Sequence, residues 1–147
     1  MELNTASAVV SFAKDLEDKS SRVYEEVSKK HLKEEGVFLS FADENKKNRD
    51  HIVRVYYSVI SDAMEGCFSF DGIDTASYEF DTSLPAGMSL SDAVRMAAAM
   101  EDKIAKFYTK AAKTSKSLLA DIPETFERLA RKRKERMVRL KKLVEKG

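Results

Sequence analysis

The sequence predicts an all-α fold: an antiparallel four-helix bundle in which one long connection joins the second and third helices. Four segments have apolar residues that recur with the 3.6-residue period of an α-helix. The 147-residue chain has only five Gly and two Pro, and 35% of its residues are charged, which is typical of amphipathic helices with solvated outer faces. The links between the segments are short except for residues 64–88. We therefore expect one domain that spans residues 1–147.

The first helix is expected over about residues 5–31 and the second over about residues 35–63. Asn4 or Thr5 can cap the first helix, because a short polar side chain accepts a hydrogen bond from the free N–H groups of the opening turn. The residues predicted to face inward share one side of each helix: Val10, Ala13, Glu17, Ser20, Tyr24 and Val27 in the first, and Phe38, Phe41, Ala42, Asn45, Ile52, Val55 and Ile60 in the second.

Residues 64–88 break the helical period and form the long connection. Four helix-breaking residues interrupt this stretch: Gly66, Gly72, Pro85 and Gly87. Its aromatic residues are predicted to pack the connection onto the bundle: Phe68, Phe70, Tyr78 and Phe80. A lid or a partner-binding surface is the alternative for a connection of this length.

The third helix is expected over about residues 89–117 and the fourth over about residues 121–146. Ser89-x-x-Asp92 has the form of a capping box. Pro123 is tolerated in the first turn of the fourth helix, where the N–H that it lacks would have no partner. The inward-facing residues are Val94, Ala97, Ala98, Glu101, Ile104, Ala105, Tyr108 and Ala112, then Phe126, Ala130, Arg133, Met137, Leu140 and Val144, with Leu129, Arg136 and Leu143 beside them.

The two halves of the chain repeat one another. Glu-Asp-Lys occurs at residues 17–19 and 101–103, and a tyrosine follows seven positions after each glutamate, at Tyr24 and Tyr108. The second and fourth helices match at a constant offset of 88, which aligns Phe38, Phe41, Ala42, Asn45 and Asn48 with Phe126, Leu129, Ala130, Arg133 and Arg136. A two-helix unit used twice predicts a bundle with approximate two-fold symmetry.

On these motifs the chain resembles the rubrerythrin-like branch of the ferritin-like superfamily, across essentially its whole length. That branch has Ala-x-x-x-Glu followed by Tyr on the first and third helices. This chain has the same pattern in Glu17 with Tyr24 and in Glu101 with Tyr108. The resemblance implies a ferritin-like bundle and, for members with the full ligand set, a di-iron oxidoreductase site.

Of the second family motif, only the apolar residue and the alanine that precede the metal-binding pair are present. On the second and fourth helices the family has Glu-x-x-His after an apolar residue and an alanine. The apolar residue and the alanine are present here at residues 41–42 and 129–130, but Asn45-x-x-Asn48 and Arg133-x-x-Arg136 replace Glu-x-x-His. Both copies of the metal-binding pair are therefore missing.

A di-iron carboxylate site needs about four carboxylates and two neutral imidazoles. Glu17 and Glu101 are the only ligand-type residues retained in this constellation. A guanidinium stays protonated and has no free lone pair, so it cannot bind a metal. We therefore expect no metal and no cofactor. Our hypothesis is that Arg133 and Arg136 bridge Glu17 and Glu101 where the metals would lie, with Tyr24, Tyr108, Asn45 and Asn48 completing the hydrogen bonds.

Three alternatives remain open for this region. A shifted register would use Glu44 and His51, which are seven residues apart, as metal ligands. A single weakly held cation would bind Glu17 and Glu101. Arg136 would alternatively extend to solvent while its aliphatic stem packs against the core.

Composition excludes several classes of protein. The net charge of +1 gives no global field that favours nucleic acid. The single Cys67 rules out an intramolecular disulfide and suits a reducing compartment. The sequence has neither a signal peptide nor a run of about 20 apolar residues. We expect a cytoplasmic homodimer without a membrane span.

The leading functional hypothesis is a non-catalytic binding or structural module. The first alternative is a non-haem di-iron oxidoreductase, of peroxidase or ferroxidase type, with a divergent site. The absence of a Cys-x-x-Cys segment that would deliver electrons disfavours it. The second alternative is association with nucleic acid or a membrane surface through the basic residues 131–142. Cations near a helix C-terminus also have a structural explanation, because they interact favourably with the helix dipole.

Overall fold

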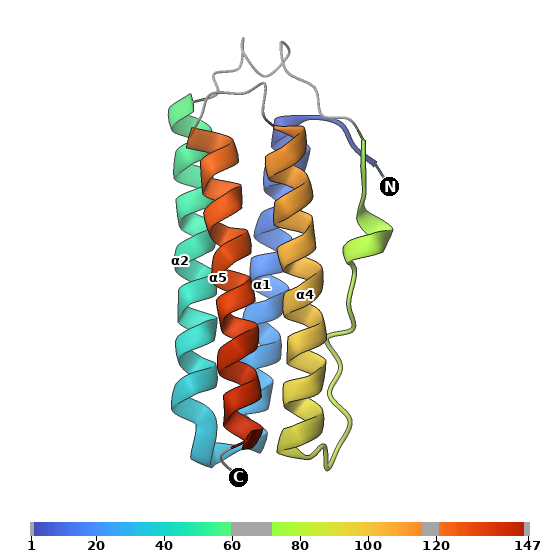
Figure 1. Cartoon of the computed structure of the whole chain (residues 1–147), viewed down its shortest axis with the longest axis vertical. Helices are drawn as coiled ribbons and strands as arrows, with labels where there is room; N and C mark the ends of the chain where they lie inside the picture. The colour runs from blue at the N-terminus through green and yellow to red at the C-terminus, as the bar shows by residue number, and fades with distance from the viewer. Residues whose placement is uncertain (1, 60–71, 116–120, 146–147) are drawn as a thin grey trace.

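The computed structural model describes residues 2–59, 72–115 and 121–145. Within these residues the fold is all-α, as predicted, with four long helices (Figure 1). They are α1 (Ala6–Lys30), α2 (Glu35–Val59), α4 (Leu90–Thr114) and α5 (Asp121–Glu145). A short 3-10 helix, η1 (Leu32–Glu34), joins α1 directly to α2.

The helix ends follow the predicted capping residues. Thr5 caps α1 by accepting a hydrogen bond of 3.1 Å from the backbone N–H of Ala8. Ser89 caps α4 in the same way, with a 3.1 Å bond from the N–H of Asp92. The predicted end of α4 at residue 117 is wrong, because the helix ends at Thr114 and Ser115 is a C-cap with non-helical dihedral angles. The predicted helical residues 60–63 and 146 lie outside the described residues.

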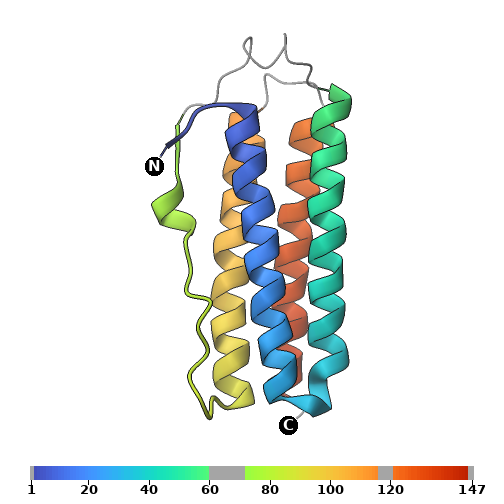
Figure 2. The same cartoon turned by 180° about the vertical axis from the view of Figure 1, so that it is seen from behind.

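The helices form two antiparallel hairpins, α1 with α2 and α4 with α5, that lie side by side (Figures 1 and 2). Packing within each hairpin is more extensive than packing between them. Apolar side chains form most of the core, and the aromatic rings of Tyr24 and Phe41 pack together at 5.2 Å, as do those of Tyr108 and Phe126 at 6.0 Å. Among the described residues, no helix contains an apolar stretch that could span a bilayer.

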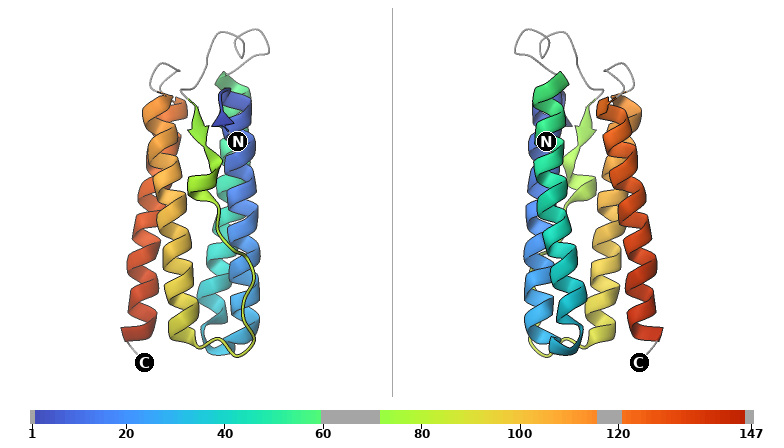
Figure 3. Two further views of the ribbon diagram at one scale, coloured as in Figure 1. Left: turned by 90° about the vertical axis from the view of Figure 1, so that its right-hand side faces the viewer. Right: turned by 90° about the vertical axis from the view of Figure 1, so that its left-hand side faces the viewer.

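The connection between α2 and α4 covers one side of the bundle (Figure 3). It includes β2 (Ile73–Asp74), which pairs antiparallel with β1 (Glu2–Leu3), and the 3-10 helix η2 (Thr75–Tyr78), which contacts α4. Tyr78 packs edge-on against Phe107 at 5.5 Å, and Phe80 also packs against the core, as predicted. Phe68 and Phe70 lie outside the described residues. The strand pair was not predicted, because strands of two residues are too short to show a period.

Most residues predicted to face inward are buried. Ala98, Val55, Met137, Leu143 and Val144 are instead half-buried, and Ile60 lies outside the described residues. Polar and charged residues are buried midway along all four helices, on the same inward faces as the apolar core. This polar centre of the bundle is the candidate functional site.

A buried Glu-Arg network as the candidate functional site

All eight site residues predicted from the sequence are buried inside the bundle, with exposed fractions between 0% and 5%. They come from all four helices, because each occupies an inward position of its helical period: Glu17 and Tyr24 on α1, Asn45 and Asn48 on α2, Glu101 and Tyr108 on α4, and Arg133 and Arg136 on α5. Hydrogen bonds join seven of them into one network. Asn48 is buried nearby, and its amide nitrogen has no hydrogen-bond partner among the described residues.

Arg133 is the centre of the network. Its Nη1 donates to both carboxylate oxygens of Glu101, at 2.9 and 3.0 Å. Its Nη2 donates to both carboxylate oxygens of Glu17, at 2.6 Å each, and to Ser20 Oγ at 3.2 Å. One guanidinium on α5 therefore joins the carboxylates of α1 and α4, which come from different hairpins.

The two tyrosines form crossed hydrogen bonds between the hairpins. Tyr24 on α1 donates its hydroxyl to Glu101 on α4 at 2.5 Å. Tyr108 on α4 donates to Glu17 on α1 at 2.7 Å. This reciprocal pair of hydrogen bonds has the approximate two-fold symmetry that the sequence repeat predicts. Each carboxylate consequently receives a tyrosine hydroxyl from the opposite hairpin and N–H groups from Arg133.

Arg136 extends the network from the centre toward the edge of the bundle. Its Nη1 donates to Asn45 Oδ1 at 2.7 Å and to Glu101 at 3.2 Å, and its Nη2 donates to Glu44 at 2.8 Å. The guanidinium also lies 4.8 Å from the ring centre of Phe41, a cation–π distance. Arg136 is only 2% exposed, so the alternative in which it extends to solvent is wrong.

Two members of the network, Ser20 and Glu44, were not predicted as site residues. Ser20 was predicted to face inward but not to belong to the site. Its hydroxyl accepts a hydrogen bond of 2.9 Å from Asn45 Nδ2 and donates one of 3.0 Å to the backbone carbonyl of Glu17. Glu44 lies beside the inward-facing residues of α2. Its side chain is 37% exposed, and its carboxylate bonds Arg136. The only sequence signal for Glu44 was its position next to Asn45. A glutamate side chain is long enough to reach the inward face of the helix from that neighbouring position.

The charges of the network stabilise one another. Burial disfavours the charged form of Arg133, but Glu101 and Glu17 outweigh this effect and raise the pKa of Arg133 well above its ordinary value. Burial, reinforced by Glu101, raises the pKa of Tyr24 well above its ordinary value, and burial with Glu17 does the same for Tyr108. The arginine is therefore charged and the tyrosines are neutral donors across the physiological range.

Glu44 is also ionised, at the edge of the network. Partial burial opposes its ionisation, but the charge and the hydrogen bond of Arg136 outweigh that effect and lower the pKa of Glu44. The fully buried charges are two carboxylates and two guanidiniums, and Glu44 adds a half-exposed carboxylate beside Arg136. Paired burial of this kind is the condition under which charges are tolerated in a protein core.

The residues at this site do not fit a di-iron centre. All four oxygens of Glu17 and Glu101 accept hydrogen bonds from Arg133, so a positive group already lies between the two carboxylates. Among the described residues, no group of three or more His, Cys, Asp and Glu side chains is arranged to hold a metal ion. The shifted register is no better, because Glu44 is bonded to Arg136.

His51, the other residue of the shifted register, lies in a different environment. It lines a surface groove between α2 and α5. Partial burial and the nearby charges of Arg128, Arg54 and Lys132 lower the pKa of His51. The basic stretch at residues 131–142 is accordingly divided, since Arg133 and Arg136 belong to the core while Arg131, Lys134 and Arg139 are exposed.

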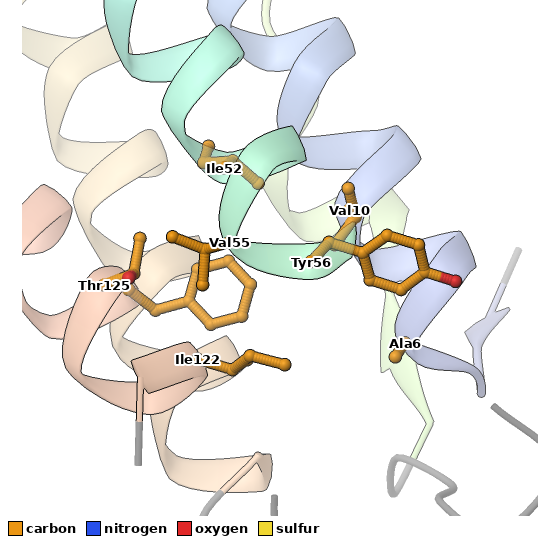
Figure 4. A pocket seen from close by; sticks show the side chains of 8 residues that line it. Ala6, Val10, Ile52, Val55, Tyr56, Ile122 and Thr125 are labelled. Atoms are coloured by element: carbon orange, nitrogen blue, oxygen red, sulfur yellow. The ribbon is translucent and has the colours of Figure 1, made fainter. Parts of the chain in front are cut away.

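An apolar cavity lies near one end of the bundle, where α1, α2 and α5 meet (Figure 4). Its walls include Val10 of α1, Ile52 of α2 and Ile122 of α5. Its volume of about 10 Å³ is room for roughly one water molecule. We interpret it as a packing defect, too small to be a ligand site, so the buried network remains the candidate site.

No protein-family model, curated protein or solved structure matches the chain. The functional argument therefore rests on the geometry of the network.

Proposed function

We propose that this chain is a ferritin-like bundle of the rubrerythrin-like type in which a guanidinium replaces the di-iron centre. In this proposal the protein is a metal-free structural or binding module and not an oxidoreductase. The observation that carries it is the position of Arg133, whose two terminal nitrogens bond all four oxygens of Glu17 and Glu101. These are the atoms with which the two glutamates would bind metal.

Electrostatics supports the same proposal. A divalent cation placed within about 4 Å of a guanidinium is repelled by several kcal/mol even at an effective dielectric constant of ~20. Releasing Arg133 would not remove this repulsion, because Arg136 lies against Glu101 as well. The arginines thus supply the positive charge that metal ions would supply in a di-iron protein.

The direct test is the metal content of the protein after expression with excess iron. We expect less than stoichiometric iron, no oxo-di-iron absorption in the near-ultraviolet, and no increase in melting temperature on addition of Fe²⁺ or Mn²⁺. Incorporation of about two irons per chain, the occupancy of a carboxylate di-iron site, would overturn the proposal.

A converse experiment tests the ferritin-like part of the proposal separately. The variant Asn45→Glu, Asn48→His, Arg133→Glu, Arg136→His restores the missing ligands at all four positions. We expect it to bind iron, whereas a control with Gln at the same four positions should not. Failure of a folded ligand-restored variant to bind iron would argue against ferritin-like geometry, without changing the result for the native chain.

A further inference from the structure

The two broad sides of the bundle differ in how they are covered. The connection that contains β2 and η2 runs over the side formed by α1 and α4 (Figure 3, left). On the opposite side, formed by α2 and α5, no segment of the described chain crosses the helices (Figure 3, right). A groove of about 470 Å³ lies on this open side, between α2 and α5.

Basic residues from both helices line part of this groove. His51 on α2 and Arg128 and Arg131 on α5 line it. Arg54 and Lys132 lie close enough to act on the charge of His51, together with Arg128. His51 is therefore surrounded by cations that come from two different helices.

Within the described residues, these cations form no close ion pairs with carboxylates. None of Arg54, Arg128, Arg131 and Lys132 forms an ion pair within the part of the chain that the structure describes. Other surface cations do find partners, such as Arg49 with Asp18 at 2.7 Å and Lys106 with Asp102 at 2.8 Å. A group of like charges without close partners attracts anions to the surface on which it lies.

The groove also has an acidic end. Asp121 and Glu124 line it at the start of α5, and Glu127 lies one helical turn before Arg131. An extended polyanion such as a nucleic-acid strand would have to pass these carboxylates, which would repel it. A compact anion can instead contact the basic residues alone. The charge distribution thus favours a small, highly charged anion.

We propose that the groove between α2 and α5 binds a compact phosphate-bearing ligand through His51, Arg128 and Arg131, with Arg54 and Lys132 adding positive charge at its rim. Arginine suits this role because its planar fork matches the oxygens of a phosphate group. The proposal goes beyond the metal-free function of the core and does not depend on it, since none of these five residues bonds the Glu-Arg network through its side chain in the described structure.

The test uses the full-length chain, with inorganic pyrophosphate as the probe at constant ionic strength. The chain has only two histidines, so the NMR titration of the His51 imidazole can be followed individually and assigned with a His31→Gln variant. A bound anion stabilises the imidazolium, so pyrophosphate should raise the pKa of His51. Isothermal calorimetry should give saturable binding with one site per chain.

Two double variants make the test specific. Arg128→Gln with Arg131→Gln removes the proposed ligands, and affinity should fall by about tenfold or more for each charge-assisted hydrogen bond lost. Arg95→Gln with Lys106→Gln removes the same net charge from exposed positions on α4 and should leave binding unchanged.

Equal loss of binding in the two double variants would overturn the proposal, because it would show a general charge effect. Absence of any His51 shift at millimolar pyrophosphate would do the same. If single-stranded DNA binds through Arg128 and Arg131 more tightly than pyrophosphate does, the ligand of the groove is a polyanion and the proposal of a compact anion is wrong. The unfolding transition of each double variant shows whether the two arginines are needed for folding and not for binding. It should be similar in both double variants.

Discussion

Arg133 is the residue on which the charge balance of the core depends. It neutralises two carboxylates that are both fully buried, and it receives no compensation from solvent because it is itself 1% exposed. Taking such groups out of water costs several kcal/mol per ion, and the cost is offset only while the partners remain together. Loss of Arg133 should therefore be far more damaging than loss of an exposed cation.

Replacement of Arg133 by Met keeps most of the side-chain volume and removes the charge. We expect the free energy of unfolding to fall by about 3–5 kcal/mol, because Glu17 and Glu101 would then lack their common partner. Urea denaturation measures the change.

The matched control is Lys134→Met, which removes the same charge from an exposed position on the same helix. It should change stability by less than about 0.5 kcal/mol. Similar effects of the two substitutions would show that the buried ion pairs do not stabilise the bundle.

Tyr24 and Tyr108 should resist ionisation in the folded protein. The pKa of each is raised well above its ordinary value by burial and a neighbouring glutamate. A raised folded-state pKa means that each contributes stability below the unfolded pKa of about 10, and that this contribution is lost as the pH rises further. Spectrophotometric titration should show a tyrosine fraction that ionises only with unfolding.

The variant Tyr24→Phe with Tyr108→Phe should remove that late fraction. Each substitution should also cost about 1.5–3 kcal/mol, the usual contribution of a hydrogen bond to a charged group. A late fraction that persists in the double variant would have to arise from other tyrosines.

At the scale of elements, α2 and α5 make unequal contributions although they occupy equivalent places in the repeat. Arg133 and Arg136 on α5 supply two guanidiniums to the core. The equivalent residues on α2, Asn45 and Asn48, supply two neutral amides. A further contact between these helices, from Glu44 to Arg136, has no counterpart that the repeat would predict. It joins the core network to the surface of the bundle.

The substitution Glu44→Gln tests this contact. The pKa of Glu44 is lowered, so its stabilising effect should be present above its ordinary pKa of 4.5 and should disappear as the pH falls below that value. Because the side chain is 37% exposed, the loss near neutral pH should be at most about 1 kcal/mol. Thermal melts from acidic to neutral pH measure it, with Glu35→Gln, an exposed change on the same helix, as the control.

The sequence was most informative where a structural signal is local. Capping residues such as Thr5 and Ser89 predicted where α1 and α4 begin to within one residue. The helical period and the repeat likewise placed the site residues on inward faces. Pairing between distant segments was not predictable in this way. The crossed bonds of Tyr24 and Tyr108 join residues 77 and 91 positions apart, and the β1–β2 pair depends on where the long connection returns.

For the molecule as a whole, the network need not be the most stable filling of the core. Buried ion pairs can often be replaced by neutral side chains of similar volume without loss of stability. The triple variant Arg133→Met, Glu17→Gln, Glu101→Gln leaves no carboxylate at the centre, and the two tyrosine hydroxyls can donate to the new amides.

We expect this triple variant to recover most of the stability that Arg133→Met alone loses, as measured by urea denaturation. The recovery would show that charge balance, and not one particular set of contacts, is what the core requires. A triple variant as unstable as the single one would instead assign the stabilisation to the bidentate geometry of Arg133.

The unequal distribution of charge between the two hairpins has a consequence for how chains can associate. Among the described residues, the first hairpin buries Glu17 as its only charged side chain, whereas the second buries Glu101 with Arg133 and Arg136. If two chains associated through like hairpins, a bundle of two first hairpins would enclose carboxylates without a cation. A bundle of two second hairpins would enclose more guanidiniums than carboxylates. Only unlike hairpins give an electrically neutral interior, so the core selects against the pairing of like hairpins. A domain swap pairs the first hairpin of one chain with the second hairpin of another, so it keeps the interior neutral.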